Sequence, residues 1–309
     1  MRVVEDYPRT LMELERRFAT DEACAEYLAQ LRWAREFSCP ACGITKAWAT
    51  RRGLRMCATC GHQVSVTART IFQDTRTPLT LWFRAIWWVV SQKPGASALG
   101  LQHVLGLGSY RTAWTWLHKL RRAMVRPGRD RLTGAVEVDE TFVGGVEPGG
   151  GRRHLGKKAL VAVAAEVRGP AIGRIRLRRV SDSSADSLLR FVEEAVTPGT
   201  VVITDGLQSY RGLPEVGYRH DRRVLLGSGE SAQAVLPRVH RVASLLKRWL
   251  LGTHQGAVSR EHLDDYLDEF TFRFNRRTSR YRVMQFYTLV AQAVGVEPVP
   301  YSRLIAGTT

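Results

Sequence analysis

Two closely spaced pairs of cysteines narrow the possible folds of this chain more than any other motif does. Cys39 and Cys42 form one CxxC knuckle, and Cys57 and Cys60 form a second after fourteen intervening residues. A glycine follows each knuckle and permits the positive φ that turns both thiolates toward one point. The intervening stretch is long enough for a short hairpin, so the four sulfurs can complete a tetrahedral Zn²⁺ site. Because four thiolates leave no open position, the sequence predicts a structural zinc ribbon.

The expected compartment bears on how these cysteines are used. Residues 1–8 carry charges where a signal peptide needs an apolar run, and the longest apolar stretch, residues 79–90, is short and interrupted by Arg84. We therefore expect a cytoplasmic, nucleoid-associated protein, where reducing conditions favour metal binding over disulfides. A redox dithiol or four free thiols are the alternatives, and His62 could serve as a substitute ligand. Cys24, the fifth cysteine, lies in a helical pattern and is expected to be buried.

The charge of the chain points to nucleic acid as its partner. Among 309 residues, 46 are Lys or Arg and 29 are Asp or Glu, which gives a formal net charge of +17. Most of the excess lies in residues 51–135, which hold fourteen basic and two acidic side chains. A basic surface of this size attracts phosphate, and the ordinary globular composition excludes a disordered basic tail. A merely solvated basic face is the competing interpretation.

The basic segment has a helical pattern. Residues 79–90 are apolar nearly all round and predict a buried helix. Ser97 and Ser109 are suitable N-caps for two further helices, at 98–105 and from 110 to about 126, joined by a glycine-containing turn. This pattern predicts a helix-turn-helix, although an ordinary helical hairpin would share it. The candidate DNA contacts on the second helix are Arg111, Lys119, Arg121 and Arg122.

After Gly134 the sequence alternates between apolar and polar residues, as strands do. Strands are predicted at residues 135–143, 159–167, 172–180 and 201–204, with a helix at 184–195 before the last of them. This order resembles the opening of an RNase H-like α/β domain, whose first strand carries an acid at its middle and whose fourth ends on a second acid. Asp139 and Asp205 occupy these places. Two hard oxygen ligands in a basic chain indicate Mg²⁺ or Mn²⁺ for phosphoryl transfer.

A third ligand is expected on a later helix, which His240 opens. Lys247 follows seven residues later, two turns along and therefore on the same helix face. The alternative is a packing or DNA-contacting histidine, with the third ligand supplied by Glu230, Asp264 or Glu269.

Two glutamates flank the first acid. Glu137 shares a strand face with Asp139 and could support it, because side chains two residues apart in a strand point the same way. Glu140 points to the other face and is expected in a structural ion pair.

Motifs from about residue 20 to 290 resemble those of one family. The chain is similar to bacterial insertion-sequence transposases of the DDE type, in the ISXO-like branch that carries an N-terminal zinc ribbon and is related to eukaryotic Merlin elements. Besides the paired CxxC, the motifs lie at residues 136–145, 204–206, 209–210, 244–248, 252–254, 262–270 and 273–277. Where the family pattern has glutamate this chain has His240, so we hypothesise a DDH site that tolerates Mn²⁺ at least as well as Mg²⁺.

The resemblance implies a DNA transposase that binds the terminal inverted repeats of its insertion sequence and catalyses metal-dependent DNA cleavage and strand transfer. It implies double-stranded DNA as the partner and a homodimer or larger synaptic assembly. Lys247 would belong to the catalytic site. The further candidate DNA contacts are Arg152, Arg153, Lys157 and Lys158 in a glycine-rich loop, and Arg248 beside Lys247.

Two other functions share parts of this pattern. A domesticated or decayed transposase acting as a DNA-binding regulator would keep the basic segment, and His240 is the residue that favours it. An RNase H-like nuclease or resolvase would keep the metal site.

The sequence divides into four expected segments. These are an N-terminal helix with the zinc ribbon (1–70), a helix-turn-helix segment (71–130), an RNase H-like catalytic domain (131–295) and a C-terminal tail (296–309). Aromatic residues between Trp249 and Phe274 fall at helical spacing and are expected in the core.

Overall fold

The chain forms two compact units, which a computed structural model describes over residues 7–34, 36–126, 128–144, 158–224, 232–279 and 283–306. Unit 1 comprises residues 1–126 and 278–306, and unit 2 comprises residues 127–277 together with 307–309. This division differs from the expected one, in which residues up to 295 belonged to the catalytic domain and the rest formed a tail. The segment 278–306 joins unit 1 because its apolar residues complete the core there: the ring of Phe286 packs against Phe18, Phe83 and Trp87.

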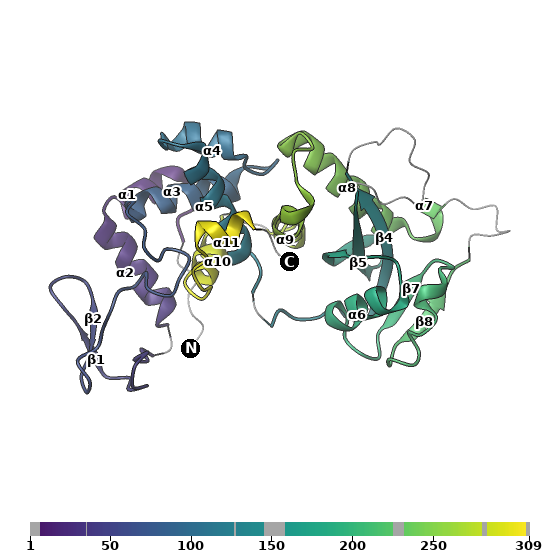
Figure 1. Ribbon diagram of the computed structural model, residues 1–309, viewed down its shortest axis with the longest axis horizontal. Helices are drawn as coiled ribbons and strands as arrows, with labels where there is room; N and C mark the ends of the chain where they lie inside the picture. Colours follow the sequence, from purple (N-terminus) through teal and green to yellow (C-terminus); the bar gives the residue numbers. More distant parts are fainter. Residues whose placement is uncertain are drawn as a thin grey trace. The chain divides into compact units, whose positions relative to one another are not determined.

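Unit 1 combines a small ribbon with a helical core (Figure 1). Its helices are α1 (Leu11–Arg17), α2 (Asp21–Arg32), α3 (Leu79–Ser91), α4 (Ala98–Leu105), α5 (Tyr110–Ala123), α10 (Met284–Ala293) and α11 (Tyr301–Ile305). Helix α3 is apolar on most of its surface and largely buried, as the sequence predicts. Ser97 and Ser109 cap α4 and α5 as predicted, each accepting a hydrogen bond from a backbone N–H of its helix. Helix α5 ends at Ala123, slightly before the expected end.

The ribbon is a three-stranded antiparallel sheet held to the end of α2. Its strands are β1 (Ala47–Ala49), β2 (Arg55–Cys57) and β3 (Gln63–Val64). The Arg32 guanidinium donates to the carbonyl oxygens of Ser65 and Val66 at 3.0 and 2.7 Å. The guanidinium of Arg55 stacks over the Trp33 ring. These contacts satisfy the carbonyl oxygens of Ser65 and Val66, which follow β3, and attach the ribbon to the end of the preceding helix α2.

Unit 2 contains a five-stranded mixed sheet in the order β6-β5-β4-β7-β8. The strands are β4 (Ala135–Val143), β5 (Ala159–Arg168), β6 (Ala171–Val180), β7 (Val201–Thr204) and β8 (Arg219–Arg222). The first three pair antiparallel, whereas β4–β7 and β7–β8 pair parallel. Counted along the chain this is the order 3-2-1-4-5, which defines an RNase H-like core and confirms the predicted fold.

Helices cover both faces of this sheet, so each strand alternates between two cores. Helix α6 (Ala185–Ala195) packs on one face, where Val136, Val138 and Val202 point. Helices α8 (Pro237–His254) and α9 (Leu263–Asn275) cover the other face. Shorter elements are α7 (Ala232–Val235) and the 3₁₀ turns η1 (Gln208–Tyr210) and η2 (Arg260–His262).

The aromatic side chains of α9 are core residues, as predicted. Tyr266, Phe270, Phe272 and Phe274 are all buried. At the end of the helix, the Asn275 side chain accepts from the Ile175 N–H at 2.7 Å and donates to its carbonyl oxygen at 3.2 Å. This amide takes the place of a further strand at the edge of the sheet.

Candidate active site

The four ribbon cysteines meet at one point in the structure. The Sγ atoms of all four lie within 4.8 Å of one another, with 3.7 Å between Cys39 and Cys60 and 3.5 Å between Cys42 and Cys57. Sulfurs bound tetrahedrally at about 2.3 Å from zinc would be about 3.8 Å apart, so the cluster fits one zinc ion. Gly43 and Gly61 have φ of 75° and 70°, as the knuckles require.

The backbone around the second knuckle favours the thiolate form of one of the four cysteines. Backbone N–H groups of Cys60 and Thr59 lower the pKa of the Cys57 thiol to about 6, which favours the thiolate that binds metal. Cys24 lies elsewhere and is fully buried, as predicted.

Asp139 and Asp205 lie beside each other on one face of the sheet. Strands β4 and β7 run parallel with Glu137 opposite Ile203, and continuing this register by two residues places Asp205 level with Asp139. Ile203 belongs to the core beneath α8 and α9, so the alternation of side chains along β4 turns Asp139 toward these helices. Asp205 directly follows β7, close enough for its charge to raise the pKa of Asp139. One Asp205 oxygen accepts from the Leu207 N–H at 3.0 Å, which orients the carboxylate.

Helix α8 brings His240 to the same place. Its Nε2 lies 3.7 Å from an Asp139 carboxylate oxygen, and both side chains are partly exposed, at 30% and 19%. Ligands each about 2.1 Å from a divalent ion can be at most about 4.2 Å apart, so one ion can bridge this pair. The ligand atoms of Asp139, Asp205 and His240 do not all lie within 4.8 Å of one another, so Asp205 would have to approach to share that ion.

The site concentrates negative charge that lacks full compensation. Burial, and then repulsion by Glu140 and Asp205, raises the pKa of Asp139 to about 7, while the positive charge of Lys247 acts in the opposite direction. A divalent ion would relieve this repulsion and favour the ionised carboxylates. The donor set of two carboxylates and an imidazole therefore suits Mg²⁺ or Mn²⁺.

The described partner of Glu140 is a hydroxyl group and not the expected cation. Glu140 points away from Asp139 as predicted, but its described partner is the Tyr210 hydroxyl, which donates to it at 2.9 Å. The predicted ion pair is therefore wrong. Tyr210 is buried beneath α6, and the raised pKa of Glu140, caused chiefly by burial, shows why a neutral donor suffices there.

The proposed alternatives to His240 on α9 are engaged elsewhere. Asp264 pairs with Arg179, and Glu269, which is 1% exposed, pairs with Arg273 at 2.8 Å. Glu230 lies outside the described residues.

The helix-turn-helix candidates differ in accessibility. Arg111 is exposed near the start of α5, with its guanidinium over the Tyr301 ring. Arg121 is only 2% exposed and lies 3.3 Å from the His118 ring nitrogen, which makes it a less accessible candidate than Arg111. It lies on the face of α5 that carries Leu117 and Leu120, and the count of charges along the segment did not distinguish helix faces. Lys119 and Arg122 are half-buried.

The basic candidates of unit 2 are only partly described. Arg248 and Lys247 are exposed on α8, and Lys158 is half-buried at the start of β5. Burial lowers the pKa of Lys247, and the positive charge of Lys158 lowers it further. The two side chains therefore lie in the same region. Arg152, Arg153 and Lys157 lie outside the described residues.

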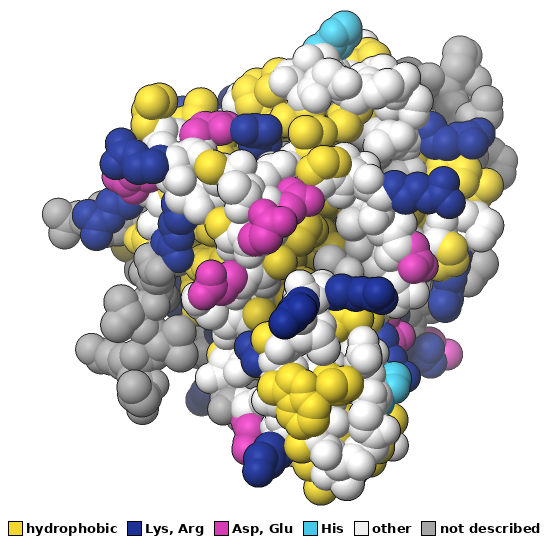
Figure 2. Space-filling view, turned by 90° about the vertical axis from the view of Figure 1, so that its left-hand side faces the viewer, with side chains coloured by type: hydrophobic (Ala, Val, Ile, Leu, Met, Phe, Trp, Pro, Cys, Tyr) yellow, Lys and Arg dark blue, Asp and Glu magenta, His cyan; other side chains and the backbone are white. Residues whose placement is uncertain are grey.

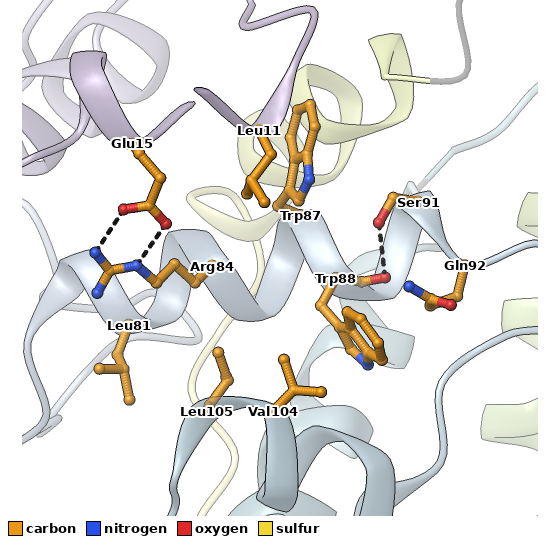
Figure 3. A pocket seen from close by; sticks show the side chains of 10 residues that line it. All are labelled: Leu11, Glu15, Leu81, Arg84, Trp87, Trp88, Ser91, Gln92, Val104 and Leu105. Atoms are coloured by element: carbon orange, nitrogen blue, oxygen red, sulfur yellow. Dashed lines mark hydrogen bonds and ion pairs between the residues drawn. The ribbon is translucent and has the colours of Figure 1, made fainter. Parts of the chain in front are cut away.

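Unit 1 also contains a pocket of about 570 Å³ between α1, α3 and α4 (Figure 3). Trp87, Trp88 and Val104 give it an apolar lining, and Glu15 pairs with Arg84 across its edge at 2.7 Å. None of these side chains belongs to the cysteine cluster or to the site of Asp139, Asp205 and His240.

Among the described residues, no helix has both the length and the apolar character needed to span a membrane.

Comparison with known proteins identifies two segments. Residues 131–275 match the family model of the ISXO2-like transposase domain, and residues 19–63 match the transposase zinc-ribbon domain. The chain therefore carries a zinc ribbon and an RNase H-like core of the kinds found in DDE transposases. A relative, the uncharacterized protein in transposable element ISH50 of Halobacterium salinarum, is 26% identical over 83% of this chain and 91% of its own length. This relative is archaeal, so it does not show the bacterial origin that was expected for the chain.

Similar solved structures are remote. The catalytic core domain of BIV integrase is 15% identical, covering 48% of this chain and 86% of that one, with a TM-score of 0.31. The Mos1 strand transfer complex is 15% identical, covering 67% and 74%, with a TM-score of 0.29. The assignment to transposases therefore rests on the two family models and the archaeal relative.

Proposed function

We propose that this protein is a DNA transposase that binds the terminal inverted repeats of its insertion sequence and catalyses metal-dependent cleavage and strand transfer. The observation that carries the proposal is the arrangement of Asp139 on β4 and Asp205 directly after the neighbouring parallel strand β7, with His240 3.7 Å from Asp139. The match of residues 131–275 to a transposase domain supports it.

The chain's own residues supply positioning and charge. Asp139, Asp205 and His240 would hold Mg²⁺ or Mn²⁺, which would supply Lewis-acid chemistry at the scissile phosphate. Lys247 and Arg248, exposed on the same helix, would neutralise phosphate charge during in-line attack by water and then by a 3′-hydroxyl. Because two element ends must be joined to one target, we expect a homodimer or larger assembly.

One assay tests this function against its rivals. Labelled element ends and a target plasmid are incubated with Mg²⁺ or Mn²⁺ and with the wild-type protein, Asp139→Asn or His240→Ala. We expect joined products from the wild type, and at least about a thousandfold loss in Asp139→Asn because a metal ligand is removed. His240→Ala should lose most joining, and full activity in this variant would contradict its assignment as the third ligand.

The same assay separates the alternatives. Cleavage without joining would favour a nuclease or resolvase. Binding without either reaction would favour the regulator, the function that the neutral His240 in place of glutamate keeps open.

The zinc ribbon is proposed as one of the DNA-binding surfaces. Lys46, Arg51 and Arg52 are exposed around its β1–β2 hairpin, and no acidic residue occurs between Glu36 and Asp74. Trp48, on β1, is 48% exposed. Figure 2 looks onto this side of the molecule, where Lys and Arg side chains lie next to exposed hydrophobic ones. Cations without nearby carboxylates suit phosphate, and an exposed indole can pack on sugar or base.

Salt dependence distinguishes these two kinds of contact. The double variant Arg51→Ala/Arg52→Ala should reduce the slope of log K against log salt by about 2, because two phosphate contacts are lost. Trp48→Ala should weaken binding and leave the slope unchanged. Fluorescence anisotropy with an element-end duplex from low to moderate salt measures both. The control Arg16→Ala/Arg303→Ala removes the same charge from exposed positions outside the ribbon, and an equal change in slope there would contradict a specific role for the ribbon.

A further inference from the structure

A fully buried carboxylate lies directly behind the candidate site. Glu137, on β4, is 0% exposed, and both of its oxygens are engaged by the start of α8. Oε2 accepts from the backbone N–H groups of Arg238 and Val239 at 2.7 and 3.1 Å, and Oε1 accepts from the Arg238 guanidinium at 2.7 Å. Arg238 was not singled out by the sequence, because nothing in the local pattern marks it.

These contacts replace a cap that the helix does not provide for itself. The first N–H groups of a helix have no partner within it and need an acceptor. Pro237, the first residue of α8, has no N–H, and Leu236 at the N-cap position makes no side-chain hydrogen bond. A carboxylate from a strand therefore satisfies the next two donors and favourably meets the positive end of the helix dipole.

The hydrogen bonds between Glu137 and the start of α8 lie beside the candidate site. Glu137 precedes Asp139 by two residues on one strand face, and Arg238 precedes His240 by two residues on α8. The ion pair of the buried Glu137 with the partly exposed Arg238 thus lies next to the pair Asp139–His240. Arg238 also donates to the carbonyl oxygens of Gly169 and Ala171 in the β5–β6 turn, which fixes the helix start from a second side.

We propose that Glu137 is a positioning residue, which clamps the start of α8 and thereby sets where His240 stands against Asp139. Its role toward the metal rests on the proposed function. Glu137 acts on the site through the helix, since both of its oxygens accept hydrogen bonds from residues at the start of α8.

Glu166 offers a matched control in the same sheet. It is 3% exposed on β5, accepts from the N–H groups of Thr133 and Arg174 at 3.2 and 3.0 Å, and pairs with the Arg174 guanidinium at 2.6 Å. It therefore resembles Glu137 in burial and bonding, but its described hydrogen-bond and ion-pair partners, Thr133, Arg168 and Arg174, all lie outside α8. Glu137→Gln and Glu166→Gln each replace one acceptor oxygen by an amide group, so both should lower the melting temperature.

The experiment compares full-length wild type, Glu137→Gln, Glu166→Gln and Asp139→Asn at a temperature where all are folded. Hydrogen exchange followed by mass spectrometry reports on residues 237–245 without metal. We expect exchange there to be about 10–100-fold faster in Glu137→Gln only, because the one remaining oxygen cannot accept from both the backbone amides and the Arg238 guanidinium, and the negative charge at the helix start is lost. Mn²⁺ binding, followed by the electron paramagnetic resonance signal of the free ion, should weaken by about 10–100-fold in Glu137→Gln and stay unchanged in Glu166→Gln.

The outcomes separate this inference from the proposed function. Unchanged exchange in Glu137→Gln, wild-type Mn²⁺ affinity in that variant, or equal losses in Glu166→Gln would each overturn the inference. If the wild type binds no Mn²⁺, or Asp139→Asn binds it as well as the wild type does, the proposed metal site fails. Faster exchange confined to Glu137→Gln would then still support the clamp on α8.

Discussion

Replacing Asp139 with asparagine is expected to stabilise the metal-free protein at neutral pH by up to about 4 kcal/mol. The pKa of Asp139 is raised to about 7 in the fold, chiefly by burial and by the neighbouring acids, from 3.8 ordinarily. A carboxyl with a raised pKa binds its proton more tightly in the folded state. Its contribution to stability is therefore complete below about pH 4 and is lost as the pH rises to about 7. Asparagine is neutral throughout and avoids this loss.

Thermal melting of the metal-free protein between pH 4 and pH 8 measures the effect. The advantage of Asp139→Asn should grow from about pH 4, level off above about pH 7, and reverse when Mg²⁺ or Mn²⁺ is added. Asp264→Asn is the control, because it removes a carboxylate that pairs with Arg179 outside the candidate site and should not stabilise the protein. A pH-independent difference between wild type and Asp139→Asn would contradict the argument.

Replacing Cys57 with serine is expected to abolish zinc binding and unfold the ribbon. Binding of structural zinc by a small domain contributes on the order of 10–16 kcal/mol at pH 7, far more than the short strands β1, β2 and β3 can supply. Cys57 is fully buried at the centre of the cluster, and backbone N–H groups favour its thiolate. Serine has a weaker, harder donor that does not replace a thiolate on zinc.

Metal analysis of purified protein tests this expectation. The wild type should hold one zinc ion per chain and Cys57→Ser none, with proteolysis of the variant confined to the ribbon. Cys24→Ala is the matched control, because Cys24 is equally buried but lies outside the cluster. Zinc retained in Cys57→Ser, or lost from Cys24→Ala, would show that the four cysteines do not form the site.

The features that sequence alone predicts well are those set by local chemistry. The knuckles need only CxxC followed by glycine, and Gly43 and Gly61 have the positive φ that this requires. The strands of unit 2 alternate between two cores, so the positions of Asp139 and Asp205 follow from their period and order. The caps Ser97 and Ser109 act within four residues of their helices.

The features that sequence missed depend on contacts between distant segments. Glu137 and Arg238 are 101 residues apart, and nothing near either one signals the other. Arg121 is basic and lies in a basic segment, but tertiary packing buries it beside His118. The hydroxyl of Tyr210 takes the place of a cation at Glu140, because burial already favours a less charged carboxyl there.

The return of residues 278–306 to unit 1 makes the RNase H-like unit an insertion within the other unit. A fragment cut before residue 127 would hold the ribbon and helices α1 to α5, yet it would lack Phe286, whose ring packs against Phe18 and Phe83. A stop codon after residue 277 would likewise spare every proposed catalytic residue and open the core of the unit proposed to bind DNA. In this chain, the core of unit 1 is therefore complete only after unit 2 has been synthesised.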